Sequence, residues 1–97
     1  MADLAPQFCQ HVLEARTAGT PLYIRGGDSK RDLLGRECAA TPLDVAGHRG
    51  IVDYQPAELF ITARAGTLLT ELSAALDDEN QLLPFEPPTF GGRATVG

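Results

Sequence analysis

The chain is organised around Leu22–Lys30, which has the sequence LYIRGGDSK. The first four residues of this segment are rich in β-formers and predict a short strand, which runs directly into the Gly26-Gly27 pair. Glycines let the backbone adopt positive φ and approach a ligand closely, so successive N–H groups can cradle a phosphate. The loop matches neither the P-loop pattern nor the Gly-x-Gly-x-x-Gly fingerprint, and Gly-Gly pairs are also common in plain turns. By itself, the segment is therefore compatible with an anion site and with a turn.

The charge pattern favours a small anion as ligand over a polyanion. The formal net charge is −5, whereas nucleic-acid binding needs a basic face, so nucleic acid is not expected as a main partner. Four of the eight basic residues nevertheless fall in one short stretch, namely Arg25, Lys30, Arg31 and Arg36. A local basic cluster in an acidic chain suggests a small anion. The alternative is a solvated loop whose charge is cancelled by its own acidic residues, Asp28, Asp32 and Glu37.

Outside this stretch, the spacing of apolar residues predicts two helices and several short strands. The first helix shows apolar residues at helical spacing and a stop signal at Gly19, and the second has a leucine stripe that follows Thr67, the expected N-cap. The expected elements are a helix over 5–18, strands over 22–25 and 43–45, an extended segment over 51–54, a strand over 59–63, a helix from 67 to about 79, and an extended segment over 82–85. This order predicts a two-layer α+β fold, with two helices against a small mixed sheet.

Several other classes of protein are disfavoured by the composition. The chain has 97 residues, one domain or less, with no apolar run near the roughly 18 residues of a membrane span and no signal-peptide pattern. Cys9 and Cys38 fit neither a metal site nor a disulfide framework, and we expect reduced thiols in a cytoplasmic protein. We expect His11 on the surface of the first helix and His48 in a solvated turn, so the histidines indicate neither a metal site nor a catalytic triad.

The tail, residues 86–97, resembles the first loop in character. It is rich in small residues, namely Gly91, Gly92, Ala94, Thr95 and Gly97. Small side chains again allow close backbone approach, and Pro87-Pro88 stiffens the entry by fixing φ. We expect a loop with no partner of its own, and composition alone also favours a disordered terminus.

Together, these segments resemble the PCMH-type flavoproteins, the vanillyl-alcohol oxidase superfamily. Residues 21–30 (PLYIRGGDSK) are similar to the first FAD-diphosphate loop of that superfamily. Residues 54–59 (YQPAEL) and 62–67 (TARAGT) are similar to its strand-to-helix signature, and residues 83–88 (LPFEPP) and 91–97 (GGRATVG) to its second flavin loop. Within the superfamily, the chain resembles the FAD-binding subunits of bacterial glycolate oxidases, from about residue 20 onward.

The resemblance implies FAD as the cofactor and the first FAD-binding subdomain as the fold. In this family the flavin lies between two subdomains, takes a hydride from a 2-hydroxy acid such as glycolate, and passes electrons to partner subunits. The first loop is implied to hold the diphosphate, mainly through backbone N–H groups, and the second to line its other side and approach the isoalloxazine. The implied cofactor-binding residues are Arg25, Gly26, Gly27, Asp28, Ser29 and Lys30, with Pro88, Gly91, Ala94, Thr95, Val96 and Gly97.

Two features of the first loop depart from the family pattern. Family loops usually carry Gly or Asn at the position of Asp28, and a carboxylate repels a diphosphate unless it points away or pairs with Lys30 or Arg31. Members with covalent flavin place a histidine in this loop, and residues 25–30 contain none. We therefore expect non-covalent FAD.

The family continues for a few hundred residues, whereas this sequence stops at Gly97, inside the second loop. We expect residues 1–97 to be an N-terminal FAD-binding subdomain, incomplete at its C-terminus, that holds FAD weakly or not at all and is inactive alone. Expected partners are a second flavoprotein subunit and an iron–sulfur subunit, which could bring the protein to a membrane, and a second copy of this chain. The alternatives are a non-catalytic half-domain for a phosphate-bearing ligand or partner, and another oxidoreductase of the superfamily, such as a lactate dehydrogenase or a sugar oxidase.

Overall fold

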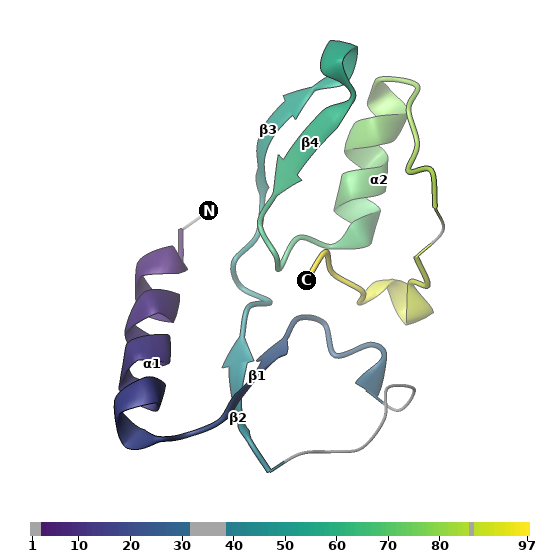
Figure 1. Ribbon diagram of the computed structural model, residues 1–97. Helices are drawn as coiled ribbons and strands as arrows, with labels where there is room; N and C mark the ends of the chain where they lie inside the picture. The colour runs from purple at the N-terminus through teal and green to yellow at the C-terminus, as the bar shows by residue number, and fades with distance from the viewer. Residues whose placement is uncertain (1–2, 32–38, 86) are drawn as a thin grey trace.

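The computed structural model describes residues 3–31, 39–85 and 87–97, and it contains two helices and two pairs of short strands there (Figure 1). The elements are α1 (Ala5–Ala18), β1 (Leu22–Arg25), β2 (Thr41–Asp44), β3 (Ile51–Gln55), a 3-10 turn (Pro56–Glu58), β4 (Phe60–Ala63), α2 (Leu69–Asp78) and a second 3-10 turn (Phe90–Gly92). The predicted α+β class with two helices is confirmed. Its small mixed sheet is divided into two separate pairs, one parallel and one antiparallel.

The two strand pairs differ in direction and in what they position. β1 and β2 are parallel, with Leu22 opposite Thr41 and Arg25 opposite Asp44. Because both strands end at the same edge, the glycine loop after β1 leaves the sheet beside the start of the β2–β3 connection. β3 and β4 form an antiparallel hairpin closed by the 3-10 turn.

The hydrophobic core lies under α2, which runs alongside the β3–β4 hairpin (Figure 1). Leu69, Leu72 and Leu76 recur at intervals of three and four, so they share one helix face, and all three are buried together with Ala94. Tyr54, Ile61, Ala63 and Leu83 pack against them. Burial of each leucine contributes roughly 1.5–3 kcal/mol, so this stripe is the main hydrophobic contribution to the stability of the fold. The helix predicted from the leucine stripe is confirmed.

The first helix is more loosely attached than the second. It ends at Gly19, whose left-handed φ of 69° fits the expected glycine stop. No α1 residue is buried, and Val12 and Leu13 remain 47% and 57% exposed. The α1 helix offers few large apolar side chains to the two-stranded β1–β2 sheet. It therefore lies at the periphery of the described fold.

Thr67 is not the N-cap of α2, contrary to the sequence-based expectation. Its side chain is fully buried, and its hydroxyl accepts from the Gly50 N–H at 3.0 Å and donates to the Gly50 carbonyl at 3.2 Å. Leu68, in an extended conformation, occupies the N-cap position without a side-chain cap. The N–H of Leu69 instead donates to the Ala94 carbonyl at 2.9 Å, so the tail supplies what the threonine was expected to supply.

Three smaller expectations are also corrected. The segment 82–85 forms no strand within the described residues, since Leu83 packs on the α2 core instead. The strand expected over 59–63 begins one residue later, because Leu59 is left-handed with φ 60°. His48 is not solvated: its side chain is 15% exposed, its Nδ1 accepts the Leu4 N–H at 3.2 Å, and its ring meets Phe8 edge-on at 5.3 Å. Four residues named in the sequence analysis lie outside the described residues, namely Asp32, Arg36, Glu37 and Cys38.

Candidate functional site

The loop after β1 presents a row of backbone donors. The N–H groups of Gly26, Gly27, Asp28 and Ser29 donate no hydrogen bond to any other described residue. Asp28 has φ 55°, a left-handed value, whereas Gly27 and Ser29 on either side of it do not have positive φ. A left-handed residue next to right-handed ones can turn successive N–H groups into one concavity, and the φ of Asp28 is compatible with such an anion nest.

The C-terminal segment is fixed to the fold, so the expectation of a loop without a partner is wrong. The Ala94 carbonyl accepts from Leu69, the Val96 N–H donates to the Thr67 carbonyl at 2.9 Å, and the Gly97 N–H donates to Ala65 at 2.8 Å. Ala94 is 2% exposed and belongs to the α2 core. The tail is held because its backbone satisfies groups at the start of α2.

The two glycine-containing loops touch each other directly. A Cβ added at Gly26 would collide with the Thr95 hydroxyl and would lie 2.8 Å from the Gly97 carbonyl oxygen. A Cβ added at Gly27 would collide with the Arg93 carbonyl group. Neither glycine needs positive φ, so it is the space, and not the backbone conformation, that requires glycine here.

A surface cavity of about 270 Å³ opens where the loops meet. Its described lining is residues 24–31 with Thr95 and Gly97. The structure therefore brings together all six predicted residues of the first loop, Arg25 to Lys30, and two of the six from the second. Of the others, Ala94 is in the core, whereas Pro88, Gly91 and Val96 are exposed and outside the lining.

Two lining residues, Ile24 and Arg31, are absent from the predicted binding set. Arg31 belongs to the basic cluster recognised in the sequence, so its charge is the signal that could have added it. Ile24 is 70% exposed at the end of a strand, and no sequence pattern distinguishes it from an ordinary strand residue.

The cationic side chains of the cavity have partners of their own. The Arg25 guanidinium lies 3.2 Å from the Asp44 carboxylate, which raises the pKa of Arg25. The pKa of Asp44 is lowered, first by the Ala46 N–H that it accepts and then by Arg25. The Arg31 guanidinium pairs with the Asp28 carboxylate at 3.3 Å. Pairing with Arg31 is one of the arrangements expected to remove the repulsion between this carboxylate and a diphosphate. The described ion pairs include none between Asp28 and Lys30.

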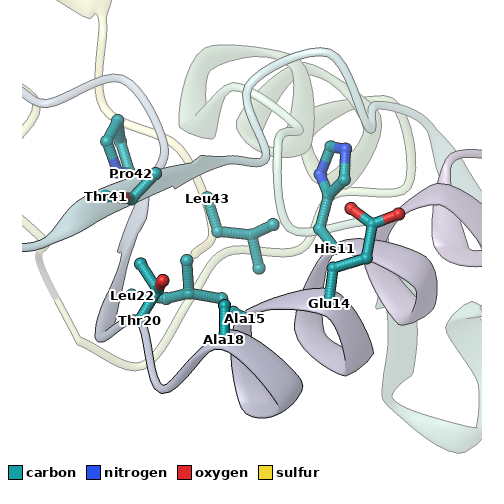
Figure 2. Close-up of a pocket in the computed structure, with 9 residues that line it drawn as sticks. All are labelled: His11, Glu14, Ala15, Ala18, Thr20, Leu22, Thr41, Pro42 and Leu43. Carbon is teal, nitrogen blue, oxygen red and sulfur yellow. The ribbon is translucent and has the colours of Figure 1, made fainter.

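A second cavity, of about 330 Å³, lies between α1 and the β1–β2 pair (Figure 2). His11 and Glu14 stand beside each other on α1 at its rim, and Leu43 points into it from β2. His11 is exposed, as predicted. Most of the lining is apolar, so this space reflects the loose packing of α1.

Other kinds of site find no support in the described residues. These contain no group of three or more His, Cys, Asp or Glu side chains placed to hold a metal ion. Cys9 is a free, exposed thiol. Among the described helices, none has the length and apolar character needed to cross a membrane.

Comparison with known proteins agrees with the loop geometry. The family described as FAD binding domain matches residues 6–97. Glycolate oxidase subunit GlcE of Escherichia coli (strain K12) is 47% identical over 95 residues, which cover 98% of this chain and 27% of that protein. The chain thus spans about a quarter of the length of this curated relative. No solved structure matches significantly. Since the family match extends over nearly the whole chain, the protein belongs to the FAD binding domain family.

Proposed function

We propose that this chain supplies the diphosphate-binding part of the FAD site in a flavin-dependent 2-hydroxy-acid oxidoreductase of the glycolate oxidase type. The observation that carries the proposal is the cavity formed where the loop after β1 meets the C-terminal segment. Family membership supplies FAD as the ligand, and the relative's name supplies glycolate as the substrate.

The residues present fit a diphosphate. Gly26 and Gly27 leave the loop backbone uncovered, and four consecutive N–H groups there have no described acceptor. Lys30 and Arg31 add positive charge to the lining. Pockets that enclose a drug-sized ligand measure about 300–1,000 Å³, and FAD is larger than such a ligand. A cavity of about 270 Å³ therefore suits the diphosphate portion and leaves the rest of FAD outside.

We assign the loop residues Arg25 to Lys30 to the diphosphate, chiefly through their backbone N–H groups. The Ser29 hydroxyl adds a neutral donor, and the Lys30 ammonium adds a charge-assisted one. Thr95 and Gly97 close the cavity from the other side. Pro88, Gly91, Ala94 and Val96 are assigned to the continuation of the site toward the isoalloxazine, with Ala94 restricted to a supporting role by its burial. Bound FAD supplies the hydride acceptor, and this part of the chain binds and orients it.

Several finer properties belong to the same proposal. FAD is held non-covalently, since residues 25–30 contain no histidine. The chain by itself holds FAD weakly and does not turn over substrate, because its cavity takes only part of the cofactor. The complete protein acts in the cytoplasm with a second flavoprotein subunit and an iron–sulfur subunit, which can bring it to the membrane.

Self-association of this chain is also proposed. Leu59, Leu82 and Phe85 are 81%, 80% and 63% exposed, and exposed apolar side chains of this size favour association. Light scattering at increasing concentration measures it, and a monomer at high concentration would contradict a homodimer.

The experiment that tests the main proposal is purification of the protein together with its neighbouring subunits, followed by absorbance in the flavin bands. We expect yellow protein whose flavin bands bleach when glycolate is added without an electron acceptor. Acid precipitation should release the flavin into the supernatant, as non-covalent binding requires. Protein that stays colourless after addition of FAD would overturn the proposal and favour a half-domain that binds another phosphate-bearing ligand or a partner.

A further inference from the structure

Asp28 occupies a position that only a few residue types tolerate. Its φ of 55° is left-handed, a region that glycine, asparagine and aspartate enter more readily than other residues. Of these three, aspartate alone carries a charge. The left-handed φ therefore explains why position 28 holds one of these three residue types, but it does not explain why the residue is charged.

Asp28 lines the cavity, and its carboxylate is already paired. Its Oδ2 is 3.3 Å from the Arg31 guanidinium, and the two side chains are 35% and 44% exposed. The other charged groups of the lining are Arg25, which faces Asp44, and Lys30, whose ammonium lies 3.4 Å from the Ser29 hydroxyl. Asp28 is the one acidic side chain among the described lining residues.

An anion that enters this cavity meets two costs from the same side chain. The Arg31 guanidinium must give up an existing partner before it can serve the anion, and once it does so the unpaired carboxylate repels the anion. Position 28 imposes neither cost when its residue keeps the left-handed backbone but carries no charge. The N–H groups of the loop are unaffected by that change.

We propose that Asp28 is a built-in counter-ion that competes with the diphosphate for Arg31 and so weakens anion binding at this loop. The inference rests on the proposed FAD function and concerns the same site. Asp28 sets the affinity of the loop, whereas the backbone sets its ability to bind.

The test compares Asp28→Asn and Asp28→Gly with the unmodified chain. Asparagine keeps the shape and the left-handed preference and removes the charge, while glycine removes the side chain entirely. The matched control is Asp78→Asn, which makes the same change in net charge at the exposed end of α2, outside the cavity lining. The probe is inorganic pyrophosphate, titrated while the amide NMR signals of residues 26–29 are recorded at low salt and at about 1 M NaCl.

We expect both Asp28 variants to bind pyrophosphate roughly tenfold more tightly than the unmodified chain at low salt, with shifts at the amides of residues 26–29. The difference should shrink at about 1 M salt, where the screening length is about 3 Å. Asp78→Asn should stay within about twofold of the unmodified chain.

Two results would overturn the inference, and they separate it from the proposed function. If the unmodified chain shifts these amides and the Asp28 variants bind no more tightly, the loop is an anion site and Asp28 is not its counter-ion. If no variant shows shifts at residues 26–29 at any pyrophosphate concentration, the anion site itself is absent and the proposed function fails with it.

Discussion

A methyl group at Gly27 should separate the two loops that form the cavity. The Cβ of Gly27→Ala would collide with the carbonyl oxygen of Arg93 and lie 2.8 Å from its carbonyl carbon. The obstacle is backbone, which cannot rotate away as a side chain can. Since Gly27 does not need positive φ, the substitution tests space without adding backbone strain.

The size of the effect follows from two opposing contributions. Overpacking of a methyl group against fixed atoms costs about 1–3 kcal/mol, and contact with a backbone carbonyl falls in the upper part of that range. Replacement of glycine also lowers the entropy of the unfolded chain, which stabilises the fold by about 0.4–1 kcal/mol. The net loss is about 2 kcal/mol, and the melting temperature of a domain of this size should fall by about 8–16 °C.

Gly47→Ala provides the control for that measurement. Gly47 also lacks positive φ, but an added Cβ would lie 3.5 Å from Leu4 Cδ1, an ordinary contact. In this variant only the lower conformational entropy of the unfolded chain changes the stability. Gly47→Ala should therefore be as stable as the unmodified chain or slightly more stable. Thermal unfolding followed by circular dichroism measures both variants. If Gly27→Ala melts at the same temperature as Gly47→Ala, the contact between the loops does not exist in solution.

Three further predictions concern a buried hydroxyl, a core leucine and an exposed ion pair. Thr67→Val should cost about 2–3 kcal/mol in urea unfolding, because it leaves the Gly50 N–H and carbonyl without their partner, and Thr67→Ser should recover most of that loss. Leu72→Ala should cost about 2–5 kcal/mol, whereas Leu82→Ala, at an 80% exposed position, should change stability by less than about 0.5 kcal/mol. A backbone N–H and a neighbouring guanidinium lower the pKa of Asp44 below its usual 3.8. The ionised carboxylate therefore stabilises the fold above pH 3.8, and this stabilisation is lost as the pH falls through the lowered pKa. Asp44→Asn should reduce the melting temperature slightly at pH 7 and leave it unchanged near pH 2.

The parts of the fold that were predictable from sequence depend on neighbours along the chain. Gly19 ends α1 because its left-handed conformation is a property of one residue. The leucines of α2 lie on one face because the helical repeat fixes their directions. Neither inference requires knowledge of what packs against the helix.

The start of α2 shows where such local reasoning fails. A threonine before a leucine stripe is the usual N-cap signal, yet Thr67 turns its hydroxyl toward Gly50, 17 residues earlier. The freed N–H of Leu69 finds the Ala94 carbonyl, 25 residues later. Both partners come from tertiary contacts, and any residue type can offer a carbonyl, so no sequence pattern marks them.

The candidate site divides in the same way. Gly26 and Gly27 are identifiable from the sequence because a glycine allows close approach to its backbone, but the atoms that approach them, the Arg93 carbonyl and the Thr95 hydroxyl, are not. Arg25 shows the reverse: its charge predicted a phosphate donor, and the parallel register places it against Asp44 instead. A donor that already has a carboxylate partner contributes less to a new anion than its formal charge suggests. Anion binding at this loop should therefore depend more on the backbone N–H groups, which the two glycines leave uncovered, than on the Arg25 guanidinium.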